Sequence, residues 1–465
     1  MKEQGFLLLI KGKTGTGKTM LAIEILKECD NSYYFSTRLP PAYLIKNVPQ
    51  LTDFLSTDHI YDATQIPPFE ITPVKRRTPP DFEKIRFQDV AEFFEILVDK
   101  VKIQEGKTVP LVVIDSWDAI FQIGEERREK SSFVKEQEFE KLFSEWVHST
   151  NIKVILILEK PIQYTIDLLA DGIVTLKDTR LNGLRIRKLE LQKLSAGRIN
   201  QPEYVFSLDG AHFRIFPPYK FKFPEILLRP EPIPDLNINA ISTGMQSFDE
   251  LLQVGYPQGS WILFELSNGV GQGFLQLLIP TLVNQLNLGR GVIATLPEGI
   301  SINHFEIYLE GFVDGEKIAQ YFILLDRPSV KENIRSKTVP LGDTLQNTLE
   351  EFHRQEDIFM SYIDGPVLKI LGLDKLEYIY SPEELRKNIP NEIAYSKTST
   401  SITLAFIKED QKLVNDLSHL ASRHYKFEII DKALFLRGIQ PQTGYVGITP
   451  VISGGYLDTK FIDIV

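Results

Sequence analysis

A glycine-rich segment near the start of the chain constrains the fold more than any other feature. Residues 12–19 read Gly-Lys-Thr-Gly-Thr-Gly-Lys-Thr, after an apolar run at 6–10 and before a helix-forming stretch at 20–26. Strand, glycine-rich loop and helix in this order turn successive backbone N–H groups toward the phosphates of a nucleotide. A glycine-rich surface turn is the alternative, and the flanking strand and helix disfavour it.

The loop provides candidate ligands for a nucleotide and its metal ion. We expect the Lys18 amine to reach the β- and γ-phosphates and the Thr19 hydroxyl to ligate Mg²⁺. The segment therefore predicts a site for ATP with Mg²⁺, formed by Gly12, Lys13, Thr14, Gly15, Thr16, Gly17, Lys18, Thr19 and Met20.

Length and composition bound the class of protein. At 465 residues the chain is too long for one core, so two or three domains are expected. Its 43% hydrophobic and 25% charged residues are typical of a soluble globular protein, and no apolar run reaches the ~20 residues of a membrane span. Residues 6–10 are too short for a signal peptide. A single cysteine, Cys29, excludes an internal disulfide framework and predicts a cytoplasmic protein.

The charge balance bears on macromolecular partners. A net charge of −10 disfavours DNA and anionic lipid as partners. One basic cluster, formed by residues 75–77 with Lys84 and Arg86, is either a local patch for nucleic acid or a solvated, proline-flanked loop.

A proline-rich segment divides the chain. Six prolines lie between Pro217 and Pro234, a density that neither a helix nor a central strand accepts. We predict an N-terminal domain at 1–216, an extended linker at 217–236 and a C-terminal domain at 237–465.

The two halves resemble copies of one design. In the second half, an apolar run at 261–266 precedes a glycine-containing loop at 267–273, which aligns with the first loop but places Gln272 and Gly273 where Lys18 and Thr19 stand. Each half also has an apolar run ending in aspartate, at 111–115 and 359–364. We therefore expect Asp364 to be the counterpart of Asp115.

Apolar strands alternate with helical stretches at 87–101 and 136–148. This alternation predicts an α/β fold with a mainly parallel sheet in each half. The loop and Asp115 both lie at carboxyl ends of strands, where such sheets bind ligands. Asp115 thus joins the candidate nucleotide site, and with Thr19 it forms the candidate metal site.

Segments spread over both halves carry a family resemblance: 112–116, 168–174, 187–193, 242–245, 248–252 and 255–260. Together they resemble the KaiC-like branch of the RecA-superfamily ATPases. Residues 35–38 are further similar to the gas vesicle regulatory proteins of the GvpD type. The resemblance implies two tandem RecA-like P-loop domains, each with a twisted sheet flanked by helices.

The resemblance implies roles that not all residues fulfil. The family's catalytic glutamate normally follows the second strand, where this chain has Ser36, Thr37 and Arg38. Glu159, at the end of a later strand, either orients water in its place or is an ordinary strand-end acid. Lys193 matches a basic residue that reaches a neighbouring subunit in ring-forming relatives, or is a solvated lysine.

In the second half the loop lacks the lysine and the hydroxyl, although Glu298 and Asp364 are expected to keep the family's acidic positions. Hydrolysis there is not expected, because the phosphate-binding charge and one Mg²⁺ ligand are missing. The second half is predicted to be structural or regulatory.

These observations predict a cytoplasmic ATP-binding protein of the KaiC-like type, with one active site that binds ATP and ADP. Lys18 and Glu159 are the candidate catalytic residues of a weak ATPase that acts as a regulatory or assembly switch. The alternatives are a DNA-binding recombination accessory factor similar to RadA paralogues and a regulator acting through protein contacts. Self-association as a ring, or a pseudo-dimer of the two halves, is also open.

Overall fold

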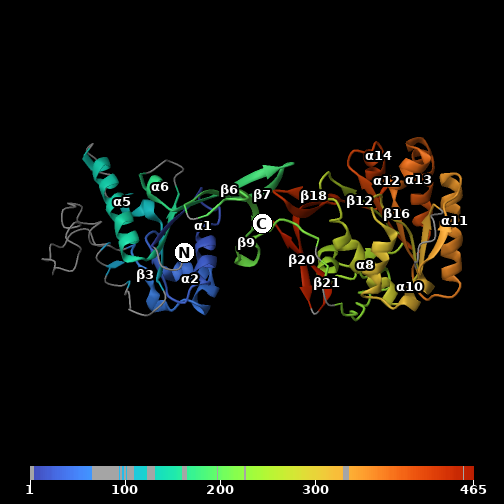
Figure 1. Ribbon diagram of the computed structural model, residues 1–465, viewed down its shortest axis with the longest axis horizontal. Helices are drawn as coiled ribbons and strands as arrows, with labels where there is room; N and C mark the ends of the chain where they lie inside the picture. The colour runs from blue at the N-terminus through green and yellow to red at the C-terminus, as the bar shows by residue number, and fades with distance from the viewer. Residues whose placement is uncertain are drawn as a thin grey trace. The chain divides into compact units, whose positions relative to one another are not determined.

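The computed structural model describes residues 5–64, 94, 97–98, 101, 109–122, 131–159, 165–195, 197–221, 223–224, 227–327, 335–453 and 455–465. The chain divides into two compact units, one of Met1–Ile215 with Val465 and the other of Phe216–Ile464 (Figure 1). Each unit has a large, mainly parallel sheet flanked by helices, which confirms two tandem α/β domains. Of the basic cluster predicted at 75–86, every residue lies outside the described part, as does most of the helix expected at 87–101.

Within the described residues the first sheet has nine strands, and those that carry the expected loop and aspartate lie near its centre. The first six in sheet order pair in parallel and the last three are added antiparallel. In sheet order the strands are β3 (Ile60–Asp62), β2 (Ser32–Ser36), β4 (Leu111–Asp115), β5 (Lys153–Leu158), β1 (Phe6–Gly12), β6 (Gly172–Leu181), β7 (Leu184–Leu194), β8 (Glu203–Ser207) and β9 (Arg214–Ile215).

Helices cover both faces of this sheet, which explains why its central strands are apolar throughout. Val113 faces Leu21 and Leu26 in one core, and its neighbour Val112 faces Phe143 in the other. The first face carries α1 (Lys18–Leu26) and α2 (Pro41–Asn47), and the second carries α5 (Ser131–Thr150), as Figure 1 shows. The other short helices of this unit are η1 (Pro49–Asp53), η2 (Thr57–His59), α4 (Trp117–Gln122), α6 (Thr165–Leu169) and η5 (Asp209–Ala211).

The second unit has a ten-stranded sheet of the same design. In sheet order its strands are β15 (Lys337–Pro340), β14 (Phe322–Asp326), β13 (Val292–Thr295), β16 (Leu368–Gly372), β17 (Ile402–Lys408), β12 (Trp261–Leu266), β18 (Arg423–Ile430), β19 (Ala433–Gln440), β20 (Gln442–Ser453) and β21 (Tyr456–Asp463). The segment β2-β4-β5-β1-β6-β7-β8 of the first sheet corresponds in order and direction to β13-β16-β17-β12-β18-β19-β20 of the second. The shared connectivity supports an internal duplication.

Helices again cover both faces of the sheet. Ile262 and Phe264 of β12 face one core, whereas Trp261 and Leu263 face the other. One face carries α7 (Gln246–Leu252), α8 (Leu275–Asn287), α9 (Ile302–Glu310) and α10 (Gly315–Tyr321). The other carries α11 (Leu345–Met360), α12 (Leu373–Tyr380), α13 (Pro382–Ser396) and α14 (Val414–Leu420). A small hairpin of β10 (Ala240–Ile241) and β11 (Tyr256–Pro257) precedes β12. None of the described helices is long and apolar enough to cross a membrane.

The predicted strand at 359–364 is wrong. Phe359 and Met360 form the last turn of α11, and Asp364 lies in the turn that leads to β16. Phe352 and Phe359 lie on the buried face of α11 and pack in the core. The apolar residues at the end of this helix therefore belong to the face of an amphipathic helix and do not form a strand.

The register of the two sheets identifies the true counterpart of Asp115. Asp115 pairs with Ile157, which pairs with Ile10 two residues before the end of β1. In the second sheet Gly372 pairs with Phe406, which pairs with Phe264 two residues before the end of β12. Gly372, and not Asp364, therefore holds the position of Asp115.

The proline-rich segment is extended, and its residues cluster with the second unit. Its backbone is hydrogen-bonded to this unit near both ends, and the Tyr219 N–H donates to the Lys432 carbonyl at 2.8 Å. Further along, the Ile233 N–H donates to Asn284 Oδ1 at 2.7 Å, and the Asn284 amide returns a bond to the Ile233 carbonyl at 3.0 Å. The segment is thus attached by specific hydrogen bonds to the turn between β18 and β19 and to α8.

Candidate nucleotide site

The glycine-rich loop joins the end of β1 to the start of α1. Gly12, Gly15 and Gly17 all have positive φ angles, of 154°, 80° and 97°. A Cβ at Gly12 would lie 2.6 Å from the Leu176 carbonyl oxygen, so a larger residue does not fit there. The glycines therefore allow the backbone to turn sharply beneath a phosphate-sized space.

Backbone donors gather at this turn. Within the described residues, the N–H groups of Gly15, Gly17, Lys18 and Thr19 have no hydrogen-bond acceptor. These groups lie at the N-terminus of α1, where the helix dipole favours an anion. The loop thus has the donors that a phosphate group requires.

Lys18 is buried and its amine is held within the loop. It donates to the Gly12 carbonyl at 2.8 Å and to the Lys13 carbonyl at 3.0 Å. Burial lowers the pKa of this amine, and the charges of Glu159 and Asp115 partly oppose that effect. The amine is therefore poorly solvated, and an anion at the loop would strengthen its charged form.

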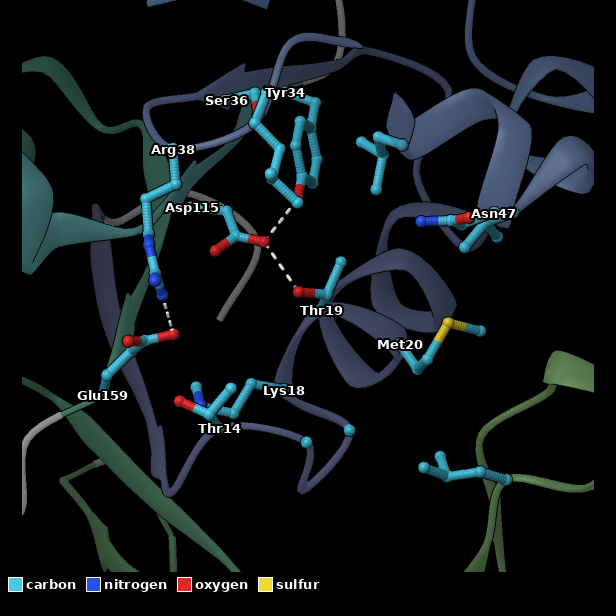
Figure 2. Close-up of a pocket in the computed structure, with 16 residues that line it drawn as sticks. Thr14, Lys18, Thr19, Met20, Tyr34, Ser36, Arg38, Asn47, Asp115 and Glu159 are labelled. Atoms are coloured by element: carbon cyan, nitrogen blue, oxygen red, sulfur yellow. Dashed lines mark hydrogen bonds and ion pairs between the residues drawn. The ribbon is translucent and has the colours of Figure 1, made fainter. Parts of the chain in front are cut away.

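Asp115, at the end of β4, is the point where two hydroxyl groups meet. Its Oδ2 accepts from the Thr19 hydroxyl at 2.7 Å and from the Tyr34 phenol at 2.6 Å (Figure 2). Tyr34 lies on the adjacent strand β2 and is fully buried, so burial and the Asp115 charge raise the pKa of its phenol well above the usual value. The structure therefore joins the two residues expected at the metal site.

Sequence reasoning missed Tyr34. The residue stands in an aromatic strand, Ser32–Ser36, and such residues are ordinarily core. Its partner is set by the sheet order, which places β2 beside β4. No local sequence signal distinguishes this tyrosine from its neighbour Tyr33.

Arg38 and Glu159 form an ion pair across the site (Figure 2). Arg38 follows β2 and Glu159 follows β5, and the two strands lie on either side of β4. The Glu159 N–H also donates to Asp118 Oδ2 at 2.5 Å, which fixes the backbone at this strand end. The carboxylate that the sequence suggests for orienting water is thus neutralised by an arginine.

All these side chains surround one cavity of about 520 Å³, a volume typical of ligand pockets. The apolar side chains that line it are Met20, Leu39, Leu44, Val48 and Leu208. Of the predicted site residues, Gly12, Lys13 and Thr16 do not line the cavity, whereas the following ones do: Thr14, Gly15, Gly17, Lys18, Thr19, Met20, Asp115 and Glu159.

Lys193, the other basic residue that the sequence singles out, is bonded within its own unit. Its amine donates to the Leu168 carbonyl at 3.0 Å and to the Asp167 carbonyl at 3.4 Å. These carbonyls belong to α6, so the lysine caps the end of that short helix.

The second unit has a smaller cavity of about 260 Å³ at the corresponding loop. Gln272 lines it where the first loop has Lys18, and Asp374, whose side chain is 6% exposed, is an acid in its wall. Asp374 is already engaged, because it accepts from the Glu298 and Lys375 N–H groups and lies 3.4 Å from the Lys408 amine. Burial is the main reason that the pKa of Asp374 is raised.

Comparisons with known proteins agree with the geometry of the first loop. Residues 1–192 match the family described as the GvpD gas vesicle protein, P-loop domain. The chain is also 22% identical to the protein GvpD1 of Halobacterium salinarum, over 96% of this chain and 92% of that protein. The likeness thus extends beyond the first unit into the second.

Proposed function

We propose that this chain, whose N-terminal unit is a GvpD-like P-loop domain, is a cytoplasmic regulator that binds ATP and hydrolyses it slowly. The observation that carries the proposal is the hydrogen bond from Thr19 to Asp115 above a loop with unpaired N–H groups. In this arrangement the loop and Lys18 hold the phosphates, and bound ATP acts as the switch. The regulatory role is supported by the relationship to GvpD proteins.

The residues of the first site fit Mg²⁺. This ion prefers hard oxygen ligands and commonly takes one or two protein groups beside substrate phosphates. Thr19 supplies a hydroxyl and Asp115 a carboxylate, 2.7 Å apart. Among the described residues no group of three or more His, Cys, Asp or Glu side chains could hold a metal ion by itself. When bound, Mg²⁺ would neutralise charge on the phosphate oxygens.

Slow turnover is expected from the groups near the phosphate position. Among the described residues, the carboxylates that line the cavity are Asp115, which is bonded to Thr19, and Glu159, which is paired with Arg38. General-base assistance contributes about 10²–10⁴-fold to a rate. We propose that Glu159 orients the attacking water only when its arginine has been displaced.

One site per chain is part of the proposal. The second loop has Gln272 in place of the phosphate-binding lysine, and Gly372 in place of the metal-binding aspartate. Without these charges a triphosphate at the second loop would face Asp374 and Glu298, and Lys408, which also lines this cavity, already lies 3.4 Å from Asp374. The second unit therefore acts as a structural or regulatory partner.

Nucleotide binding to wild type and Lys18→Ala tests the proposal. Lys141→Ala is the control, because Lys141 is an exposed lysine of the same unit that does not line the cavity. We expect one ATP per chain, turnover below about 1 s⁻¹, and loss of binding in Lys18→Ala but not in Lys141→Ala. Molecular mass with and without ATP reports whether the switch involves self-association. Equal binding by wild type and Lys18→Ala would refute the proposal.

A further inference from the structure

The charges of the Arg38–Glu159 pair are reversed at the equivalent positions of the second unit, Glu298 and Lys408. By the register of the sheets, Phe35 and Thr295 hold equivalent positions, and Arg38 and Glu298 each follow three residues later. The first unit thus has a cation where the second unit has an acid.

The same reversal occurs at the neighbouring strand end. Ile157 and Phe406 hold equivalent positions, and Glu159 and Lys408 each follow two residues later. The acid of the first unit therefore stands where the second unit has a cation. In the first unit the cation follows β2 and lines a cavity together with Lys18. In the second unit Lys408 also lines a cavity, but the loop there has Gln272 in the place of Lys18.

We propose that Arg38 senses the terminal phosphate of ATP and that Glu159 holds it in place until ATP binds. This inference rests on the proposed function and adds a regulatory step to the same site. With ATP bound, the guanidinium transfers from Glu159 to the terminal phosphate, and the released carboxylate orients water. With ADP bound, Arg38 stays on Glu159 and the carboxylate remains blocked.

The backbone around Arg38 is fixed while its side chain is half-exposed. The Thr37 N–H donates to the Asp115 carbonyl at 2.7 Å, and the Thr37 hydroxyl donates to the Ser116 carbonyl at 2.7 Å. The Arg38 side chain is 46% exposed. Its starting point is therefore rigid, and its guanidinium can change partner by side-chain rotation alone.

The exchange of partners is favourable on electrostatic grounds. An ion pair this open to water contributes little stability, so breaking it has a small cost. A guanidinium binds phosphate through two parallel hydrogen bonds, which are stronger and more specific. The terminal phosphate of a nucleotide held by Lys18 and Thr19 is therefore a better partner for Arg38 than Glu159 is.

Arg38 and Glu159 line the same cavity as Lys18 and the glycine-rich loop. Both charges also act on the Lys18 amine, whose pKa is lowered by burial and by Arg38 and raised by Glu159 and Asp115. A triphosphate held in this cavity by Lys18 would therefore share it with the Arg38 guanidinium.

The test compares ATP and ADP affinities of wild type, Arg38→Met and Glu159→Gln, each shown to fold by its circular dichroism spectrum. We expect Arg38→Met to weaken ATP binding about 10- to 100-fold, and to leave ADP binding unchanged. We expect Glu159→Gln to strengthen ATP binding by up to about fivefold, because Arg38 is released, and to lower turnover.

Lys408→Met is the matched control, since it removes the equivalent strand-end charge in the second unit, and we expect both affinities to be unchanged. If Arg38→Met does not fold, Arg38→Lys replaces it, with a smaller loss confined to ATP. Equal effects on ATP and ADP, or no effect on either, would overturn this inference. Wild-type binding that depends on Lys18 would then still support the proposed function, so the two failures are distinguishable.

Discussion

Gly372 holds in the second sheet the register position that Asp115 holds in the first. The second unit therefore has no carboxylate at this position, and the packing around Gly372 leaves no space for an aspartate side chain. A Cβ at Gly372 would lie 2.6 Å from the Pro297 nitrogen and 2.7 Å from the Leu296 carbonyl carbon. The backbone after β13 thus occupies the space in which the first unit keeps its aspartate side chain.

Gly372→Ala is therefore expected to destabilise the second unit. Its atoms would overlap backbone that cannot move without disturbing the sheet, and overpacking of this kind costs about 1–3 kcal/mol in the free energy of unfolding. Urea denaturation measures the effect. Gly444→Ala is the control, because a Cβ at Gly444 meets nothing within 4 Å. A Gly372→Ala protein as stable as wild type would show that the backbone of residues 296–297 yields easily.

Local signals were sufficient to predict the first loop, its flanking elements and the strand that ends in Asp115. An apolar strand buried on both faces and a glycine-rich turn can each be recognised from a short, continuous stretch of sequence. The expected strand at 359–364 failed because apolar residues at the end of an amphipathic helix resemble a short buried strand. Only the sheet register, which depends on residues far apart in the chain, shows that Gly372 is the counterpart.

The polar contacts of the site could not be predicted for the same reason. The contact of Tyr34 with Asp115 depends on β2 lying beside β4, and the Arg38–Glu159 pair depends on β2 and β5 flanking that strand. Sequence identifies which residues follow strand ends. The sequence does not show which strands are neighbours in the sheet. Contacts between side chains from different strand ends therefore cannot be predicted from it.

Tyr34→Phe is expected to lower the stability of the first unit. The phenol donates to a carboxylate at 2.6 Å within a buried site. Hydrogen bonds to charged groups contribute about 1.5–3 kcal/mol to stability, and urea denaturation at pH 8 should show a loss of this size. Tyr43→Phe is the control, because Tyr43 is 61% exposed. An unchanged denaturation midpoint would mean that water replaces the phenol.

Tyr34 should also make the free energy of unfolding of the first unit depend on pH in the alkaline range. Burial and the Asp115 charge raise the pKa of Tyr34 in the folded protein above its unfolded value near 10.0. Above pH 10 the unfolded chain ionises and the folded site does not, so the stabilising contribution declines as pH rises. The decline is about 1.4 kcal/mol per pH unit. The stability difference between wild type and Tyr34→Phe should therefore be constant up to pH 10 and shrink above it.

Thr19→Val is expected to separate metal-dependent from metal-independent nucleotide binding. The substitution removes the hydroxyl that faces Asp115 but preserves the side-chain shape. We expect the ATP affinity of this variant to fall to the value that wild type shows with EDTA, and to respond little to added Mg²⁺. Thr14→Val, in the same cavity, serves as the control and should keep the Mg²⁺ response. A full Mg²⁺ response in Thr19→Val would exclude the hydroxyl as a ligand.

Lys369 in β16 should be essential to the stability of the second unit. Its amine lies 3.0 Å from Glu356 and 3.1 Å from Glu392, and all three side chains are buried. Lys369→Met leaves two buried carboxylates without their cation, and removal of one partner of such a cluster costs about 3–5 kcal/mol. Urea denaturation is the measurement.

A second substitution separates loss of charge balance from loss of packing. In Lys369→Met with Glu356→Gln, the remaining carboxylate of Glu392 still has His353 at 2.7 Å, so part of the stability should return. Arg386→Met is the control for an exposed pair, because both Arg386 and Asp416 are 53% exposed, and it should cost less than about 1 kcal/mol. If the double variant is no more stable than Lys369→Met, packing of the lysine stem, and not its charge, is what the cluster requires.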